Sequence, residues 1–381
     1  MHRLALFEAL AALAVLAPAG WSQPAVTREN GQWVRTFRGT VAAAPRLRIN
    51  AHGPVTLEGG VARELTYTVK VGVKARTAEQ ARRLLERFAV RAESRGEWVV
   101  LTMPGGAATA TAVLRAPHLK LVEISNSDGA VEANGIDGSL KIDSVADQLR
   151  CDRIRGDCRL VTGGGAIHVG LVEGSLHCAT GAGHITVGTV RGEAVMQTNG
   201  GDITAMQVDG AVTAETAGGT VRIQSAGGPV NAVNGGGPII IGKAGGIVTA
   251  RNMAGPVQVG AAAGVRCESR TGGIRLTNIT GSMSVSTAMG SILATLLGGK
   301  LADSFLATGN GDITVFIPSN VGVRIRAENE MADTLRRIIS DFRELQVRRQ
   351  GTQVVAEGAV NGGGPLLQIS ATAGTIFIKR Q

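Results

Sequence analysis

Glycine recurs along this chain at intervals of 18 residues, and this spacing constrains the fold more than any other feature of the sequence. One interval of 17 interrupts it, and a second glycine follows nine residues after the first in nearly every unit. A fixed period of this size is the signature of a repeat architecture, and about eleven units can be counted from Lys120 onward. The recurring glycines are Gly138, Gly156, Gly174, Gly192, Gly210, Gly228, Gly246, Gly264, Gly281 and Gly299.

Apolar residues complete the repeat. With the first glycine of a unit as position 0, they fall at positions 2 and 4 and again at 11 and 13, as in Ile167, Ile185 and Ile203 at position 11. Alternation of this kind predicts two short strands per unit, each with one buried face. Such units bury that face only by stacking as parallel strands about 4.8 Å apart. We therefore predict an all-β, single-stranded parallel β-solenoid with about 18 residues per coil. The spacing favours a two-faced roll over a three-faced helix and leaves the handedness open.

The composition agrees with a thin core. Glycine accounts for 54 of 381 residues and aromatic residues for 3%, yet 44% of the chain is hydrophobic, which argues against disorder. Position 6 carries a small polar residue in every unit, and such a column can hydrogen-bond along the stack. These residues are Asn126, Ser144, Thr162, Thr180, Thr198, Thr216, Asn234, Asn252, Ser269 and Thr287.

The N-terminus predicts export. A short basic start precedes an apolar run over 4–17, and Ala17-Pro18-Ala19 fits the cleavage rule for signal peptides. The run is too short to span a bilayer, and no later stretch reaches that length. We expect residues 1–19 to be removed, leaving a mature chain without a transmembrane segment in the periplasm, at the cell surface or in the medium.

Regions outside the array are expected to cap its open strand edges. We assign 20–115 to N-terminal strands with a capping helix, 116–318 to the array, and 319–381 to a C-terminal cap with a closing coil. Thr77 is the expected N-cap of the first helix, with Gln80 completing a capping box. The expected elements are strands over Leu47–Leu57, Leu65–Lys74 and Glu97–Met103, helices over Thr77–Glu93 and Ala332–Phe342, and the closing coil from Pro365.

Three motifs were tested as ligand sites. Gly237–Ala244 approaches the phosphate-binding loop but lacks its Ser or Thr. His168 and His184 could be neighbours across adjacent coils, with His177 on the other strand, but a two-histidine site with no carboxylate between the two side chains is weak. Asp202 and Asp312 resemble calcium-binding β-roll repeats, which need such an Asp in every half-turn. We therefore predict no metal, cofactor or nucleotide site.

Nor does the array predict catalysis. β-Helical polysaccharide lyases and hydrolases cluster acidic and basic residues on one face, whereas the outward positions here are scattered Thr, Gln, Asp, Arg and Ala. No nucleophile motif is present either, so we predict no catalytic residues and a protein that is not an enzyme.

Four cysteines occupy inward positions of the repeat: Cys151, Cys158, Cys178 and Cys267. Cys158 and Cys178 are two positions and one coil apart, too far to bridge. Cys151 and Cys158 could meet across a narrow core. Four buried thiols are the favoured interpretation, and a Cys151–Cys158 disulfide stays open.

The formal charge of +9 suits anionic partners such as phosphorylated polysaccharide or lipid head groups. Nucleic acid is disfavoured by the export signal and by the lack of aromatic residues interleaved with the arginines that carry the excess charge. The excess lies largely outside the repeats, in Arg82, Arg83, Arg87, Arg91, Arg95, Arg336, Arg337, Arg343, Arg348 and Arg349.

Half-turns such as Gly201–Ala205 and Gly311–Val315, together with the Asn361–Pro365 run and the terminal strand Gly374–Lys379, resemble the bacterial DUF4097 family, whose members are called adhesins by analogy. The resemblance covers some nine-tenths of the chain and implies a β-solenoid in the cell envelope, with no catalytic residues to carry over. The leading hypothesis is an adhesin-like surface that binds a glycan, a lipid or another envelope protein. The alternatives are a self-assembling scaffold and a carbohydrate-active enzyme.

Overall fold

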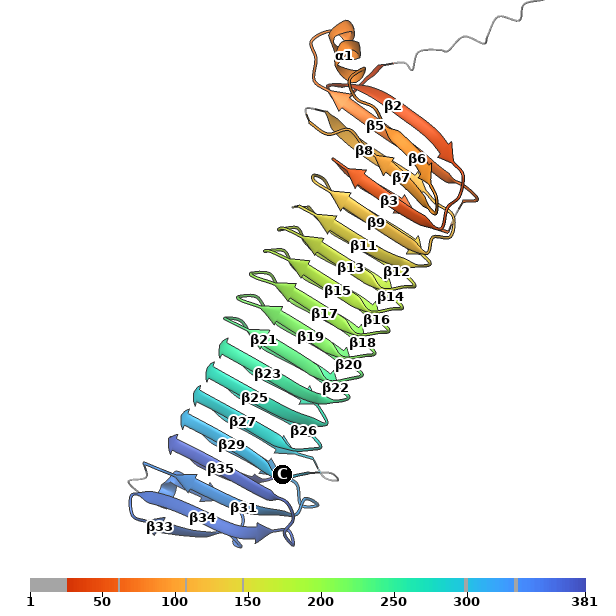
Figure 1. Ribbon diagram of the computed structural model, residues 1–381. Helices are drawn as coiled ribbons and strands as arrows, with labels where there is room; N and C mark the ends of the chain where they lie inside the picture. The colour runs from red at the N-terminus through yellow and green to blue at the C-terminus, as the bar shows by residue number, and fades with distance from the viewer. Residues whose placement is uncertain (1–25, 61, 107, 146, 298–300, 332–334) are drawn as a thin grey trace, which may run out of the picture.

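The computed structural model describes residues 26–60, 62–106, 108–145, 147–297, 301–331 and 335–381. They form a straight rod of stacked coils, in which each coil contributes one strand to each of two parallel sheets (Figure 1). The β-solenoid and its two-faced form are therefore confirmed. The predicted signal peptide, 1–19, lies outside the described residues.

Strands of the first sheet, sheet A, carry mostly even numbers. They are β1 (Thr27–Glu29), β2 (Gln32–Val41), β4 (Val55–Glu58), β5 (Leu65–Val73), β8 (Thr109–Arg115), β10 (Val131–Ile136), β12 (Leu149–Ile154), β14 (Ile167–Val172), β16 (Ile185–Val190), β18 (Ile203–Val208), β20 (Val221–Ala226), β22 (Ile239–Ala244), β24 (Val257–Ala261), β26 (Ile274–Ile279), β28 (Ile292–Leu296), β30 (Ile313–Ile317), β32 (Ile338–Ser340) and β36 (Ile376–Arg380).

Strands of the second sheet, sheet B, face the viewer in Figure 1. They are β3 (Arg46–Ala51), β6 (Arg91–Arg95), β7 (Trp98–Thr102), β9 (Leu121–Asn126), β11 (Ser139–Ser144), β13 (Cys158–Thr162), β15 (Leu176–Thr180), β17 (Ala194–Thr198), β19 (Val212–Thr216), β21 (Val230–Asn234), β23 (Ile247–Ala254), β25 (Gly264–Thr271), β27 (Met283–Met289), β29 (Ser304–Asn310), β31 (Val323–Asn329), β33 (Gln346–Gln350), β34 (Gln353–Val360) and β35 (Leu366–Ala373). The helices are α1 (Ala78–Leu85) and the 3-10 turn η1 (Leu335–Arg337).

Successive coils pair in parallel with an offset of 18 residues. Leu140 lies beside Cys158 in sheet B, and Leu149 lies beside Ile167 in sheet A. One coil has an offset of 17 residues instead of 18. In the structure this short coil comes before Gly264, which pairs with Ile247, whereas the glycine spacing placed it between Gly264 and Gly281. Between β27 and β29 the offset grows to 21, with Ser284 beside Phe305. Gly299 falls in this longer stretch and lies outside the described residues.

The core is a single aliphatic column between the two sheets. Positions 2, 4, 11 and 13 are buried as predicted. A further inward column, which was not predicted, lies at position 16 and includes Ile154, Val172 and Val190. Two outward residues separate positions 13 and 16, so the strand must bend between them. At this bend Arg153 takes a left-handed backbone conformation with φ of 52°.

The glycine at position 9 is required by the close approach of neighbouring coils. A Cβ atom added to Gly201 would lie 2.0 Å from the carbonyl oxygen of Gly183 in the preceding coil. The position 9 glycine of the preceding coil, Gly183, has the same relation to Gly165. A side chain at this position would force the coils apart, which explains why the column is nearly invariant along the array.

Both ends of the stack are interleaved. At the N-terminal end the coil of β3 and β4 lies between β9/β10 and the coil of β7 and β8, which follows it in sequence. At the C-terminal end β35 pairs with both β29 and β31, and β36 with both β30 and β32. The closing coil predicted from Pro365 therefore forms, but it is inserted into the stack rather than placed at its end.

Antiparallel strands complete the caps. Sheet A continues from β8 through β5 and β2 to β1, and sheet B ends in β6 on one side and in β34 and β33 on the other. Of the outermost strands, β1, β6 and β33 read TRE, RAESR and QVRRQ, whereas β32 at the C-terminal edge of sheet A reads IIS. Charged edges of this kind oppose pairing with another sheet.

Several local predictions need correction. The strand predicted over Leu47–Leu57 is two strands, because the chain turns a corner at Gly53 and Pro54. Helix α1 starts after Thr77, whose hydroxyl accepts a hydrogen bond from the backbone N–H of Gln80, but the helix ends at Leu85. The sequence after it pairs with β7 as β6, so the helix predicted up to Glu93 is too long.

The second helix prediction, over Ala332–Phe342, is also wrong where it can be judged. Residues 332–334 lie outside the described residues, Leu335–Arg337 form one 3-10 turn, and Ile338–Ser340 pair with β36 as a strand.

Candidate binding face along the rod

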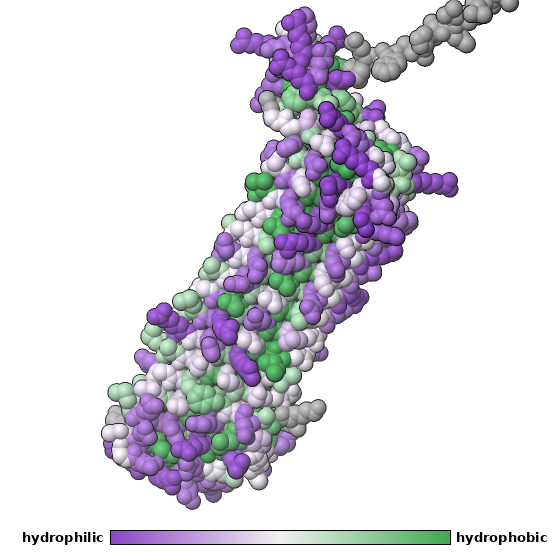
Figure 2. Space-filling view, in the orientation of Figure 1, coloured by the Kyte–Doolittle hydropathy of each residue, from purple (hydrophilic) through white to green (hydrophobic). Residues whose placement is uncertain are grey.

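The outward face of sheet B is a long, nearly flat surface formed by positions 3 and 5 of each coil. In Figure 2 this face is turned to the viewer, and hydrophilic side chains gather at both ends of the rod while small and apolar residues show along its length. The position 3 column runs through Arg48, Glu123, Lys141, Arg159, His177, Val195, Thr213 and Asn231.

A shallow groove of about 670 Å³ follows the corner where the sheet B strands end. It extends over five coils, so its length is about 20 Å from the spacing of parallel strands. One wall is formed by the position 5 side chains and the other by the small residues at position 7. The position 5 wall contains Val161, Ala179, Gln197, Glu215 and Val233, and the position 7 wall contains Gly163, Gly181, Asn199, Ala217 and Gly235.

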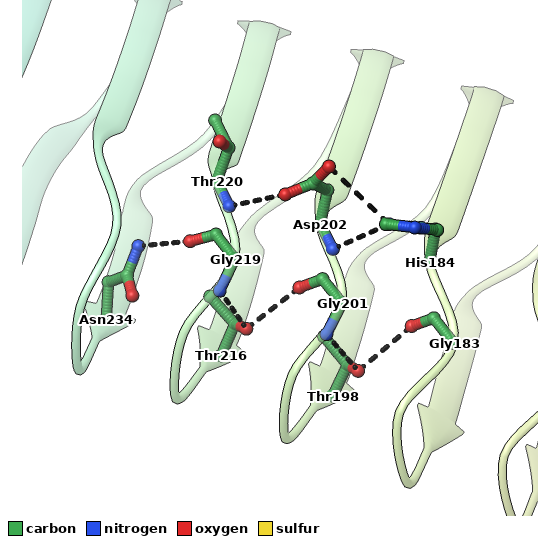
Figure 3. Close-up of polar contacts among 9 residues, drawn as sticks. All are labelled: Gly183, His184, Thr198, Gly201, Asp202, Thr216, Gly219, Thr220 and Asn234. Carbon is green, nitrogen blue, oxygen red and sulfur yellow. Dashed lines mark hydrogen bonds and ion pairs between the residues drawn. The ribbon is translucent and has the colours of Figure 1, made fainter.

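The floor of the groove is the position 6 column (Figure 3). The Thr198 hydroxyl donates to the carbonyl oxygen of Gly183 in the preceding coil at 3.0 Å and accepts from the Gly201 amide of its own turn at 3.2 Å. Thr216 repeats both contacts one coil later, and the Asn234 amide donates to Gly219. These buried side chains satisfy turn backbone groups, and they fix the corner so that its outline repeats from coil to coil.

The polar column is broken where serine replaces threonine or asparagine. The hydroxyl oxygens of Ser144 and Ser269 are buried and have no hydrogen-bond partner among the described residues. Threonine has a methyl group that restricts χ1, whereas serine rotates more freely. The groove lies in the unbroken stretch between these two serines.

The opposite corner, where sheet A leads into the next coil, carries alternating charges at position 17. Arg155 contacts Asp137 at 2.8 Å, and Arg191 contacts Asp209 at 2.8 Å, with Glu173 between the two pairs. The hydrogen bond from Arg191 raises the pKa of its own guanidinium and lowers the pKa of the Asp209 carboxyl. Exposed pairs of this kind add little stability each, but they favour the 18-residue register.

The three histidines considered as metal ligands are not brought together. His168 lies beside Arg150 and Thr186, so the expected pairing with His184 is not formed. His184 instead accepts a hydrogen bond at 3.0 Å from the backbone amide of Asp202. His177 lies on sheet B, where partial burial and then the charge of Arg159 lower its pKa. No group of three or more metal-ligating side chains occurs in the part of the chain that the structure describes.

The other two motifs have structural explanations. The Asp202 carboxylate accepts from the backbone amide of Thr220 in the next coil at 2.7 Å, and Asp312 accepts from Thr375 at 2.8 Å. Both aspartates thus cap a neighbouring strand. In the phosphate-loop-like segment, the Gly237 amide donates to the Asn234 side chain at 3.1 Å, so it is already occupied.

All four cysteines are free and buried. A hydrogen bond with Cys158 and then burial raise the pKa of the Cys151 thiol. Burial likewise raises the pKa of Cys178, and that of Cys267 to about 12. The thiols of Cys151, Cys178 and Cys267 are therefore held in their unreactive protonated form.

The groove is not among the sites predicted from the sequence. The recurrence of small residues at position 7 over five coils was a sign of the groove in the sequence, but the depth of a groove depends on the path of the turn and not on residue size alone.

No helix among the described residues has the length and apolar character needed to cross a bilayer.

No family model matches the chain, and no curated protein is similar to it. Solved structures of bacterial proteins are similar over most of its length. One is a "putative cell adhesion protein" from Clostridium sporogenes, with 10% identity, 91% of this chain and all of that chain covered, and a TM-score of 0.20. Another is a "putative adhesin" from Bacteroides fragilis, with 14% identity, 68% and 96% covered, and a TM-score of 0.27. A third, from Parabacteroides distasonis, has 10% identity, 71% and 96% covered, and a TM-score of 0.23. At these scores the similarity carries no argument, and the fold assignment rests on the strand register.

Proposed function

We propose that this chain is an exported, adhesin-like binding module of the bacterial cell envelope, related to the DUF4097 family, and that it is not an enzyme. The observation that supports this most is the outward face of sheet B: a rigid, flat surface with a groove along five coils. A rod whose backbone hydrogen bonds run along its axis presents that face without rearrangement, so little free energy is lost in ordering it on binding.

The charge distribution supports two kinds of contact. Exposed arginines gather on α1, β6 and β33 at the two ends of the rod, where an anionic polysaccharide or lipid head group would be attracted. The groove, in contrast, contains a single charged residue, Glu215, among the described residues that line it. Contacts at the ends should weaken with salt, whereas contacts in the groove should not.

The scaffold alternative has less support. End-to-end growth needs free strand edges, and the outermost strands β1, β6 and β33 carry charged residues that oppose such pairing, whereas β32 at the C-terminal edge of sheet A carries none. A molar mass that stays monomeric in light scattering from low to high concentration would argue against the scaffold. Growth of long assemblies would favour it over the binding module.

Binding is tested with the mature protein on an array of glycans, lipids and envelope extracts at low and high salt. Ala179→Trp fills the groove, and Thr186→Trp places the same side chain on the outward face of sheet A in the same coil. We expect Ala179→Trp alone to reduce salt-resistant binding. Absence of binding to every component, or release of reducing sugar ends from a bound glycan, would contradict the proposal.

A further inference from the structure

The groove is straight, and its outline repeats with the coil. Each step along it presents one position 5 side chain, one position 7 residue and one buried position 6 side chain beneath them. The coils stack in register, so equivalent positions recur about every 4.8 Å along the rod axis, although the side chains at positions 5 and 7 differ between coils. That spacing is close to the length of one sugar residue in an extended, β-linked polysaccharide. A chain lying parallel to the rod would meet the same geometry at successive residues.

The hydrogen-bonding groups of the groove are uncharged except for one carboxylate. Gln197 and Asn199 flank the floor residue Thr198 on its two sides, and both are exposed. The Gln197 amide lies 3.4 Å from the Glu215 carboxylate of the next coil. No basic side chain lines the groove among its described residues, so an acidic polymer would meet Glu215 without a compensating cation.

A peptide fits this groove less well than a glycan. Extended peptides are held by free backbone groups at the edge of a sheet. The strands beside the groove lie inside sheet B, where their backbone groups already pair with the coils on both sides. Sugar hydroxyl groups, in contrast, can use the amide and carboxylate side chains of the walls.

We infer that this groove binds an uncharged, extended polysaccharide parallel to the rod axis, with about one sugar residue per coil. The inference rests on the proposed binding function and gives its ligand a chemical class, distinct from the anionic partners expected at the ends of the rod. The groove contains no aromatic side chain for a sugar ring to stack on. Binding should therefore be weak for a single sugar and strengthen with chain length until the five coils are occupied.

The test is a calorimetric titration of the mature full-length protein with cello-oligosaccharides of increasing length, a neutral and extended β-linked probe. Oligogalacturonides serve as the acidic probe and chitosan oligomers as the basic one. We expect affinity for the neutral series to rise up to about five residues and then level off. In high salt, where contacts at the rod ends are screened, the acidic series should bind at least about tenfold more weakly than the neutral series.

Paired variants locate the site. Gln197→Ala with Asn199→Ala removes the amides of the groove walls and should weaken binding about tenfold, the effect of losing one or two hydrogen bonds. Gln224→Ala with Gln258→Ala removes two exposed amides on the outward face of sheet A, away from the groove, and should leave binding unchanged.

Tighter salt-resistant binding of the acidic series, equal effects of both variant pairs, or an affinity independent of chain length would overturn the inference while leaving a binding role intact. The same holds if an extended peptide competes for the groove and the neutral glycan does not. Loss of all binding on the array would instead remove the proposed function itself.

Discussion

Replacing Gly201 by alanine tests how closely the coils approach one another. The new Cβ atom would lie 2.0 Å from the Gly183 carbonyl oxygen, whereas ordinary contacts begin near 3.4 Å, so the two coils must separate locally by more than 1 Å. Overpacking of this kind costs about 1–3 kcal/mol. The Thr198 hydrogen bond to Gly183, now 3.0 Å long, would also be lost, which adds about 1 kcal/mol. The expected destabilisation is therefore about 2–4 kcal/mol.

The neighbouring glycine provides the control. A Cβ atom on Gly200 meets nothing within 4 Å, so Gly200→Ala should be neutral or stabilising by up to about 1 kcal/mol through the unfolded state. Urea unfolding followed by far-ultraviolet circular dichroism measures both variants against the parent protein. A difference between the two variants of less than about 0.5 kcal/mol would refute the close approach of the coils at position 9.

The polar column predicts opposite effects for two further substitutions in the same assay: Thr198→Val leaves two turn groups unpaired and should cost about 2 kcal/mol, and Ser144→Thr should gain up to about 1 kcal/mol by completing the column. A gain from valine, or a loss from threonine, would contradict the role given to these side chains. Hydrogen bonds from Arg191 and Gln207 lower the pKa of Asp209 in the folded protein. The ionised carboxylate therefore stabilises the fold above the pKa of the unfolded state, and this stabilisation is lost as pH falls through the lower pKa of the folded state. The thermal midpoint should drop less on acidification below about pH 4 in Asp209→Asn than in the parent, and identical pH profiles would refute this. The buried thiols, with the pKa of Cys267 raised to about 12, should resist Ellman's reagent in the native protein and give four equivalents after unfolding without reductant. Fewer than four would reveal a disulfide.

The stack itself could be predicted because its determinants are local and repeated. Each coil contains the same alternation of inward residues, and Gly201 or Thr198 has an equivalent in nearly every unit, so the period survives substitutions at single positions. The same reasoning explains why the position 16 column was missed: two outward residues break the alternation before it, and a strict period-two pattern does not extend to Ile154 or Val172.

The order in which the coils stack at the two ends of the rod could not be predicted from the sequence. The coil Leu366–Arg380 has the same inward pattern as any other, so its sequence does not say which strands it joins. Only the pairing of β35 with both β29 and β31 shows that it is inserted. Strand β6 is a similar case, because Arg91–Arg95 continues a helical pattern and becomes a strand only through its pairing with β7.

The charge of the chain was informative about partners only in part. The arginines of α1, β6 and β33 lie at the two ends of the rod, where they attract anions. The groove is different, because its walls consist of small and amide side chains with Glu215 as the one charged residue among those described. Net charge therefore describes the ends of this molecule and not its candidate site.

Spin-label distances along one face of sheet A test the stack most directly. Glu132, Arg222 and Arg275 are exposed and belong to a single column of paired residues. Arg222 lies five coils from Glu132 and Arg275 eight, so their backbones should be about 24 Å and about 38 Å from that of Glu132. Pulsed electron spin resonance on the two doubly labelled proteins should give narrow distributions whose centres differ by about 14 Å. Equal distances, or a shorter distance for the pair farther apart in sequence, would contradict the stacking of one coil on the next.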